Sequence, residues 1–470
     1  MGIEMERPLA SKSFGRTHLA LAGKTVTRLA CAYLVCVTLF SLLAVGVASI
    51  PRSAICPHVQ QSISELSLEG QYHRLLPEDD AWQLDNYTTA IMLNQACHSA
   101  ENPVLSAAYN FQWHGPGNGD DQISALESGM KRPRGSLSAD GWIAYGRYWH
   151  GYLSVLKPLL IAFDLSQIRV VFLLAFVALL GWSTVLLSRS EGTVTAVIYL
   201  SAFFAVHFTV AMFSLSLFFS FFIGIAATVF VQLHHDGRRD FLNSGEGVVS
   251  WLVFYFVIGG VTVFFDFLDT PIVALGLPLG MQVFLARDGI GRDQVVKTIL
   301  FALAVSLSWA IGYGGLMLTK WILSSLVTGV DFVRDGFSSV VYRSGGTSGT
   351  LKITRTAALR KNVGLLVHRW QVKMLVPPLV VALVWLAKTG RWRRLGSARW
   401  WYLIPLALVG ALPFGWYLVA DNHSFVHAFI TYRDLVVLLV VAALSIGPVI
   451  DRARRMCLWQ PEGNGASAKL

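Results

Sequence analysis

Charged residues are scarce in this sequence. They make up 14% of the 470 residues, against roughly 25% in an average soluble domain. Hydrophobic residues make up 54% of the chain, which is more apolar surface than a water-soluble protein of this length buries. Intrinsic disorder is excluded as well, because disordered chains are poor in hydrophobic residues. The long apolar runs therefore predict an all-α polytopic integral membrane protein rather than a barrel of short alternating strands.

The sequence also lacks the usual signatures of zinc, nucleotide and nucleic-acid binding. Its five cysteines form no CxxC pair and no His/Cys cluster with zinc spacing. The glycine-rich stretch 344–350 has neither the GK[ST] ending nor the preceding strand of a phosphate-binding P-loop. The net charge of +10 is carried by short basic clusters between apolar runs. We therefore expect these charges to mark membrane topology, with no nucleic-acid partner.

About ten stretches are long and apolar enough to be transmembrane helices, which need about 20 residues each. The predicted spans are 29–50, 168–187, 193–212, 214–233, 248–266, 271–286, 297–317, 373–387, 400–419 and 434–450. The sixth and eighth are the shortest. A polar leader of about 28 residues precedes the first span, which is too long for a cleaved signal peptide, so we expect an uncleaved anchor.

Lys and Arg in short loops mark the cytoplasmic side of a membrane. With ten spans, every short basic cluster falls on one side. The clusters lie in the N-terminal segment 1–28, around 238–239, 287–297 and 388–399, and in the tail 451–470. Both termini are therefore predicted to be cytoplasmic. The membrane domain 29–450 then exposes three segments on the opposite, extracytoplasmic side, namely 51–167, 318–372 and 420–433.

Two cysteines, Cys56 and Cys97, both fall in the large first extracytoplasmic loop. An oxidising compartment permits a disulfide between them. We predict this bridge, with two unpaired thiols as the alternative.

Acidic residues gather early in the same loop. Glu78, Asp79 and Asp80 form an acidic run, and Asp85 precedes a predicted helix with apolar residues at 91–93. Asp85 either caps that helix or serves at the membrane surface as a general base or metal ligand. We favour Asp85 as the catalytic base over Asp79 and Asp80, because the acidic run follows a proline and is expected to lie in solvent.

Aromatic residues crowd the end of the first loop, where Trp and Tyr side chains interleave with Arg147 and His150 over 142–152. This density is typical of an interfacial belt or of an amphipathic helix on the bilayer. The alternative is a surface that binds a sugar or a lipid phosphate, since Arg clamps phosphate groups.

Polar residues also stand at the outer ends of three predicted spans. Asp266 and Asp269 close the fifth span, where two carboxylates are costly unless paired, solvated or bound to a cation. A divalent cation is therefore a possible cofactor. Lys320, at the end of the seventh span, either snorkels to the interface or binds substrate. The turn 420–433 carries four further candidates for substrate binding, His423, His427, Tyr432 and Arg433.

The layout of spans and loops resembles the GT-C fold glycosyltransferases. The segments LDNYTTAIML, YGRYWHGYL, FFDFLDTP and NHSFVHAFITYR also resemble bacterial multispan proteins of cell-envelope glycan assembly. The resemblance implies a GT-C-like fold, a polyprenyl-phosphate sugar as donor, a glycan or glycolipid acceptor, and a working carboxylate in the first loop.

The predicted function is that of an inverting membrane glycosyltransferase acting at the extracytoplasmic face of the cytoplasmic membrane. We expect one pocket there, formed by Asp85, Arg147, Asp266, Asp269, His423, His427 and Arg433. The alternatives are a glycolipid flippase or polysaccharide-export component, and an envelope glycan polymerase or ligase of another fold. A coupled transporter places ionisable residues at mid-membrane, and His207 is the clear candidate for such a residue.

Overall fold

The chain folds as an all-α multi-pass membrane protein. The computed structural model describes residues 9–77, 79–115, 121–132, 135, 140–234, 244–345, 347–348, 351–368 and 400–458. Within them, seven helical segments are long and apolar enough to cross a membrane. They are Ala20–Ala48, Leu165–Glu191, Leu215–Leu233, Gly245–Phe265, Val295–Thr328, Trp400–Val419 and Ala428–Asp451.

These seven segments coincide with seven of the predicted spans. The predicted spans 193–212 and 271–286 correspond to shorter apolar helices, Thr193–Ala205 and Pro271–Leu285. The first of them ends early because His207 adopts the left-handed conformation, with φ of 49°, which interrupts a helix of L-residues. The predicted span 373–387 and the basic clusters at 238–239 and 388–399 lie outside the described residues, so the count of ten spans stays a prediction.

The helices of the bundle are α1 (Leu9–Ala48), α7 (Leu165–Glu191), α8 (Thr193–Ala205), α9 (Phe208–Phe213), α10 (Leu215–Leu233), α11 (Gly245–Phe265), α12 (Pro271–Leu285), α13 (Val295–Thr328), α18 (Leu403–Gly410), α19 (Leu412–Val419) and α22 (Val436–Leu458). Short 3-10 turns η2 (Arg287–Gly289), η3 (Arg292–Gln294) and η4 (Trp400–Tyr402) lie between them.

Small residues let two of these helices approach closely. A Cβ atom added at Gly259 of α11 would collide with the backbone oxygen of Trp309 in α13. One added at Gly312 of α13 would collide with the backbone oxygen of Phe256 in α11. Close packing of this kind replaces the hydrophobic driving force that helices lack in lipid.

The elements outside the bundle belong to the three segments predicted to be extracytoplasmic. In the first lie α2 (Arg52–Glu69), η1 (Asp80–Trp82), α3 (Asn86–Cys97), α4 (Pro103–Tyr109), β1 (Phe111–Trp113), α5 (Gln122–Gly129), β2 (Trp142–Ala144) and α6 (Leu153–Leu160). In the second lie α14 (Phe332–Arg343), β3 (Thr347–Ser348), β4 (Leu351–Lys352) and α15 (Arg355–Val367), and in the third α20 (Asp421–Val426), α21 (Ala428–Thr431) and η5 (Tyr432–Leu435).

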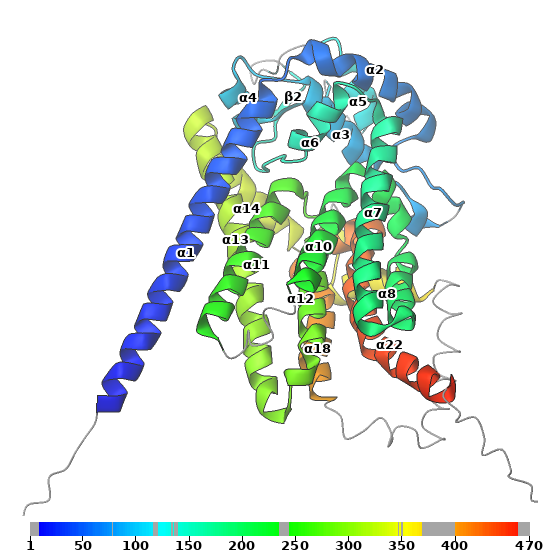
Figure 1. Ribbon diagram of the computed structural model, residues 1–470. Coiled ribbons are helices and arrows are strands. Elements are labelled where there is room, and N and C mark those ends of the chain that lie inside the picture. The colour runs from blue at the N-terminus through cyan, green and yellow to red at the C-terminus, as the bar shows by residue number, and fades with distance from the viewer. Residues whose placement is uncertain are drawn as a thin grey trace, which may run out of the picture.

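The first segment forms a cap of helices over one end of the bundle, away from the start of α1 and the end of α22 (Figure 1). β1 and β2 pair antiparallel within it, with Gln112 opposite Ile143. A disulfide joins Cys56 of α2 to Cys97 of α3, whose Cα atoms are 5.6 Å apart. The cap is therefore braced internally by both a sheet and a covalent link.

A buried arginine ties the cap to the bundle. The guanidinium of Arg169, in α7, donates hydrogen bonds to Glu65 at 2.6 Å and to Glu69 at 2.9 Å, both in α2. It also donates to the Asn86 side-chain oxygen at 2.9 Å, at the start of α3. Because a buried charge is costly without partners, these bonds hold α2 and the first turn of α3 against α7.

Candidate functional site

A pocket of 520 Å³ lies where the three predicted extracytoplasmic segments meet the turn after α11. Its lining comprises Gln71, Tyr72, Asp85, Tyr87, Thr88, Ile91, Tyr145, Phe267, Asp269, Arg343, His423, His427 and Ile430. These residues come from regions of the chain that are more than 300 positions apart, so only the tertiary fold assembles the pocket.

Asp85 is held rigidly at the N-terminus of α3. Its side chain caps the helix by accepting the Thr88 backbone N–H at 3.0 Å, and its second oxygen accepts the Ser216 hydroxyl at 3.3 Å. Ten of the twelve residues of α3 are buried, so the helix has little freedom to move. Asp85 itself is only 3% exposed, and this burial raises the pKa of its carboxyl. The capping and the functional interpretations of Asp85 are thus compatible.

The turn between α11 and α12 presents two further carboxylates. Asp266 accepts four hydrogen bonds, from the Ser220 and Tyr313 hydroxyls and from the backbone N–H groups of Leu268 and Asp269. Asp266 therefore shapes the turn and does not line the pocket, whereas Asp269 does.

Asp269 carries an unsatisfied acceptor. Its Oδ2 is buried and accepts no hydrogen bond. Burial, with the nearby negative charges of Asp266 and Asp85, raises its pKa well above the ordinary carboxyl value. A protonated Asp269 is a hydrogen-bond donor, so this side chain is suited to orient a hydroxyl or phosphate oxygen.

An arginine and two histidines also line the pocket. Arg343, the last residue of α14, donates from Nη1 to Nδ1 of His423 at 2.8 Å and from Nη2 to the Tyr148 hydroxyl at 2.9 Å. Nε2 of His423 bonds to the Leu268 backbone oxygen at 2.8 Å. Since a carbonyl only accepts, His423 carries its proton on Nε2, and Nδ1 accepts from the arginine.

Both histidines are neutral at pH 7. Burial, followed by the proximity of His427 and of the Arg343 charge, holds the pKa of His423 well below its usual value. Burial and Arg343 lower the pKa of His427 to about 4. Among the described residues that line this pocket, Arg343 is thus the permanent cation. Each of its terminal nitrogens uses one N–H in the bonds above, which leaves the second N–H of each for a ligand.

The pocket therefore combines acidic and basic groups. Asp85 and Asp269 are carboxyl groups, Arg343 is a cation, and His423 and His427 are neutral imidazoles. A carboxylate and an arginine in one pocket can accept a proton from a substrate and stabilise an anion.

Two predicted residues of the aromatic segment lie behind the pocket. Arg147 is paired with Asp335 through contacts of 3.0 Å and stacks on the Tyr145 ring at 4.4 Å. His150 bonds through Nε2 to the Tyr145 backbone oxygen at 2.8 Å. Both brace Tyr145, which does line the pocket. Arg147 and His150 therefore position Tyr145. The prediction that Arg147 itself lines the pocket is wrong.

Three other predicted substrate-binding residues are engaged elsewhere. Lys320 donates to the Ala107 backbone oxygen at 2.6 Å. Arg433 is fully buried and donates to the Ala81 backbone oxygen at 2.7 Å. The Tyr432 hydroxyl donates to the Val206 backbone oxygen at 2.9 Å. These bonds tie bundle helices and cap together, and none of the three side chains lines the pocket.

The acidic run upstream of Asp85 also lies apart from the pocket. Asp79 caps η1 by accepting the Ala81 backbone N–H at 3.0 Å. Asp80 forms an ion pair with Arg74 at 2.6 Å. Glu78 lies outside the described residues.

The donor set does not fit a metal site. In the described part of the chain, no group of three or more His, Cys, Asp and Glu side chains is placed to hold a metal ion. The oxygens of Asp266 are already taken up by four hydrogen-bond donors, which argues against the expected cation at Asp266 and Asp269.

Two pocket residues carry signals that sequence reasoning undervalued. Arg343 ends a polar helix before a glycine-rich stretch. The sequence alone does not distinguish it from the other basic residues of 318–372. Tyr72 follows Gly70, which breaks α2 with a positive φ of 75°. In both cases the sequence signal is a charged or aromatic residue close to the end of a helix.

Comparison of the chain with protein-family models, with curated proteins and with solved structures finds no match.

Proposed function

We propose that this membrane protein is a GT-C-type glycosyltransferase that moves a sugar from a polyprenyl-phosphate donor to a cell-envelope glycan or glycolipid at the extracytoplasmic face. The observation that carries the proposal is the pocket that Asp85 lines together with Arg343, His423 and His427. The donor's leaving group is a phosphate, so the reaction needs a base for the acceptor and positive charge for the departing anion.

In the proposed reaction, Asp85 takes the proton of an acceptor hydroxyl. The hydroxyl oxygen then forms a bond to the anomeric carbon as the bond from that carbon to the phosphate oxygen breaks. The electron pair leaves with the phosphate, whose charge Arg343 offsets through its remaining N–H groups. A single displacement of this kind inverts the anomeric configuration.

A neighbouring hollow suits an extended acceptor. This hollow of 640 Å³ shares Tyr72 and His427 with the pocket. Tyr72 is 46% exposed and stacks on Tyr87, with ring centroids 5.9 Å apart. Exposed aromatic rings beside polar side chains are favourable surfaces for sugars, so the acceptor glycan is assigned to this side.

The position of His207 favours an enzyme over a coupled transporter. Its ring packs on Trp82 of the cap, with centroids 4.4 Å apart, and bonds to the Tyr432 hydroxyl at 3.1 Å. His207 thus contacts the cap, whereas a transporter uses ionisable residues at mid-membrane. A flippase, an export component, or a glycan polymerase or ligase remain the alternatives.

The decisive test is sugar transfer by purified protein in detergent, with polyprenyl-phosphate sugars as donors. Asp85→Asn should lower the rate by about two to four orders of magnitude, as expected for loss of a general base, without weakening donor binding. Asp80→Asn is the matched control, because Asp80 is an exposed carboxylate of the same loop. Full activity in Asp85→Asn would remove this residue from the mechanism, and transport without transfer would favour the flippase.

A further inference from the structure

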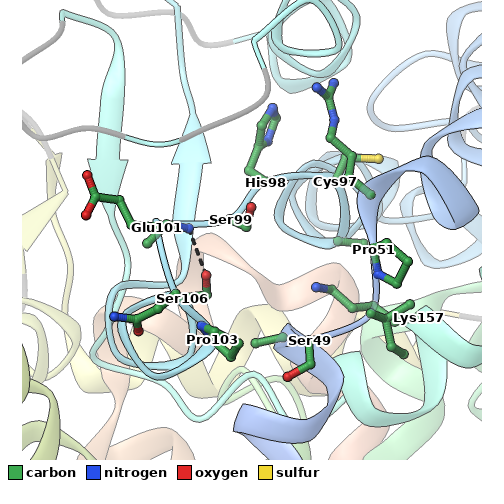
Figure 2. A pocket seen from close by; sticks show the side chains of 15 residues that line it. Ser49, Pro51, Cys97, His98, Ser99, Glu101, Pro103, Ser106 and Lys157 are labelled. Carbon is green, nitrogen blue, oxygen red and sulfur yellow. Dashed lines mark hydrogen bonds between the residues drawn. The ribbon is translucent and has the colours of Figure 1, made fainter.

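A second pocket, of 220 Å³, lies at the opposite end of α3 from Asp85. It is lined by the junction of α1 and α2, the end of α3, the start of α4 and Lys157 of α6; Figure 2 shows these lining residues. Because α1 is an apolar helix that could span the membrane up to Ala48, this pocket lies at the level where the chain leaves the bilayer.

Lys157 of α6 is the unusual residue here. Its side chain is only 4% exposed, and Figure 2 shows it extending into the pocket toward Pro103 and Ser106. No hydrogen bond or ion pair joins its ammonium group to another described residue. A buried ammonium group is costly unless it is paired, and burial lowers the pKa of Lys157 to about 8, so most of it still carries a proton at pH 7.

The remaining polar groups of the pocket are suited to an anion. Ser106 accepts the Ala100 backbone N–H at 2.8 Å, so its own hydroxyl proton is available to donate. Arg52, which also lines the pocket, adds positive charge while donating to the Met130 backbone oxygen. Glu101 is the carboxylate among the lining residues, but it is exposed and points away from Lys157 (Figure 2).

We propose that this pocket binds a phosphate group, with Lys157 as its main cationic partner and Ser106 as a hydrogen-bond donor. The phosphate belongs either to a lipid headgroup at the membrane surface or to a free anion. The site is separate from the one assigned to catalysis, so it stands or falls independently of the proposed enzymatic function.

The test uses the full-length protein in a maltoside detergent, which contains no phosphate. Inorganic phosphate and short-chain phosphatidylglycerol are titrated separately by calorimetry, in an Arg343→Ala background that weakens binding at the first pocket. We expect saturable binding of at least one probe, weakened about tenfold or more by Lys157→Met, since charge-assisted hydrogen bonds are lost. Binding of phosphate alone would indicate a free anion, and binding of the lipid alone a headgroup.

Two further variants make the outcome decisive. Lys352→Met, which removes an exposed lysine, should leave binding unchanged, and Ser106→Ala should weaken it severalfold even if Lys157→Met folds poorly. Absence of binding by both probes, or equal binding by Lys157→Met, would overturn the proposal. The proposal would also be overturned if Lys157→Met and Glu101→Gln lowered Tm equally and the double variant lowered it no further. That result would show that Glu101 is the natural counterion of Lys157.

Discussion

The histidine pair illustrates how burial decides the role of a residue. His423 and His427 share a short turn, and the sequence predicted both as substrate-binding residues. In the pocket both rings are neutral, because burial and Arg343 lower their pKa values. Arg343 cannot lose its proton in this way, so the charge that meets an anion belongs to α14, and the imidazoles act as neutral hydrogen-bond partners.

Arg343→Ala should therefore weaken donor binding. Loss of a charge-assisted hydrogen bond costs about 1.5–3 kcal/mol, so we expect KM for the lipid-phosphate donor to rise at least tenfold. Arg334→Ala is the matched control, because Arg334 is exposed on the same helix. Equal effects of the two substitutions on KM would show that Arg343 has no specific contact with the donor.

The raised pKa of Asp85 gives a second prediction at this scale. Burial favours the protonated carboxyl, and a protonated carboxyl cannot act as a base. Transfer should therefore rise with pH through the raised pKa of Asp85, and the acid limb should begin above the pH at which an ordinary carboxylate ionises. The pH profile of kcat/KM for sugar transfer measures this, and a rate that falls with rising pH over that limb would contradict it.

The raised pKa of Asp85 also affects the stability of the fold. A folded-state pKa above the unfolded value means that the ionised carboxylate destabilises the fold at neutral pH. Asn retains the oxygen that accepts the Thr88 N–H. Asp85→Asn should therefore keep or raise Tm at pH 7 while it removes activity, which separates a catalytic defect from misfolding.

Two sets of contacts between elements hold the site in place. One is the close packing of α11 against α13, and the other is the disulfide within the cap. α11 ends at the turn that carries Asp266 and Asp269, and α13 lies directly against α11. The glycine contacts between these helices therefore help to position the turn that carries Asp269.

Gly259→Leu should separate α11 from α13, because any side chain at this position meets the Trp309 backbone. Overpacking typically costs about 1–3 kcal/mol, so we expect a lower Tm and reduced transfer. Gly314→Leu, on α13 with nothing within 4 Å of an added Cβ, should change neither. If both variants unfold at the same temperature, the proposed close contact is unimportant.

The disulfide between α2 and α3 braces the helix that carries Asp85. Cys56 and Cys97 are 41 positions apart, and closing a loop of this size stabilises a fold by roughly 3–4 kcal/mol in the chain-entropy model. Replacing both cysteines with alanine should lower Tm, and reductant should lower Tm of the parent protein only. Free thiols at both positions in non-reduced, alkylated protein would refute the bridge.

For the whole molecule, the arrangement of loops is the informative feature. The three segments that the positive-inside rule assigned to one side all contribute residues to the candidate site, and they gather at the end of the bundle opposite the start of α1 (Figure 1). This convergence agrees with one common side for the three segments; that this side is extracytoplasmic stays a prediction.

Cysteine-accessibility labelling tests this topology. Asp80→Cys, in the cap, should react with a membrane-impermeant reagent in intact cells. Asp293→Cys, in the basic loop before α13, should react only after the membrane is permeabilised. Labelling of Asp293→Cys from outside would require a different arrangement of the spans.

Hydrophobicity along the chain by itself determined the class of fold and seven of the helices, because these depend on local transfer free energies. The sequence also pointed to Asp85 as the start of a helix, since capping is a local interaction. Only the tertiary structure decided that Asp85 and Arg343 line one pocket, that Arg147 and Arg433 serve as braces, and that Lys157 lacks a partner among the described residues. These features depend on contacts between residues far apart in the chain, where burial and neighbouring charges set what each side chain can do.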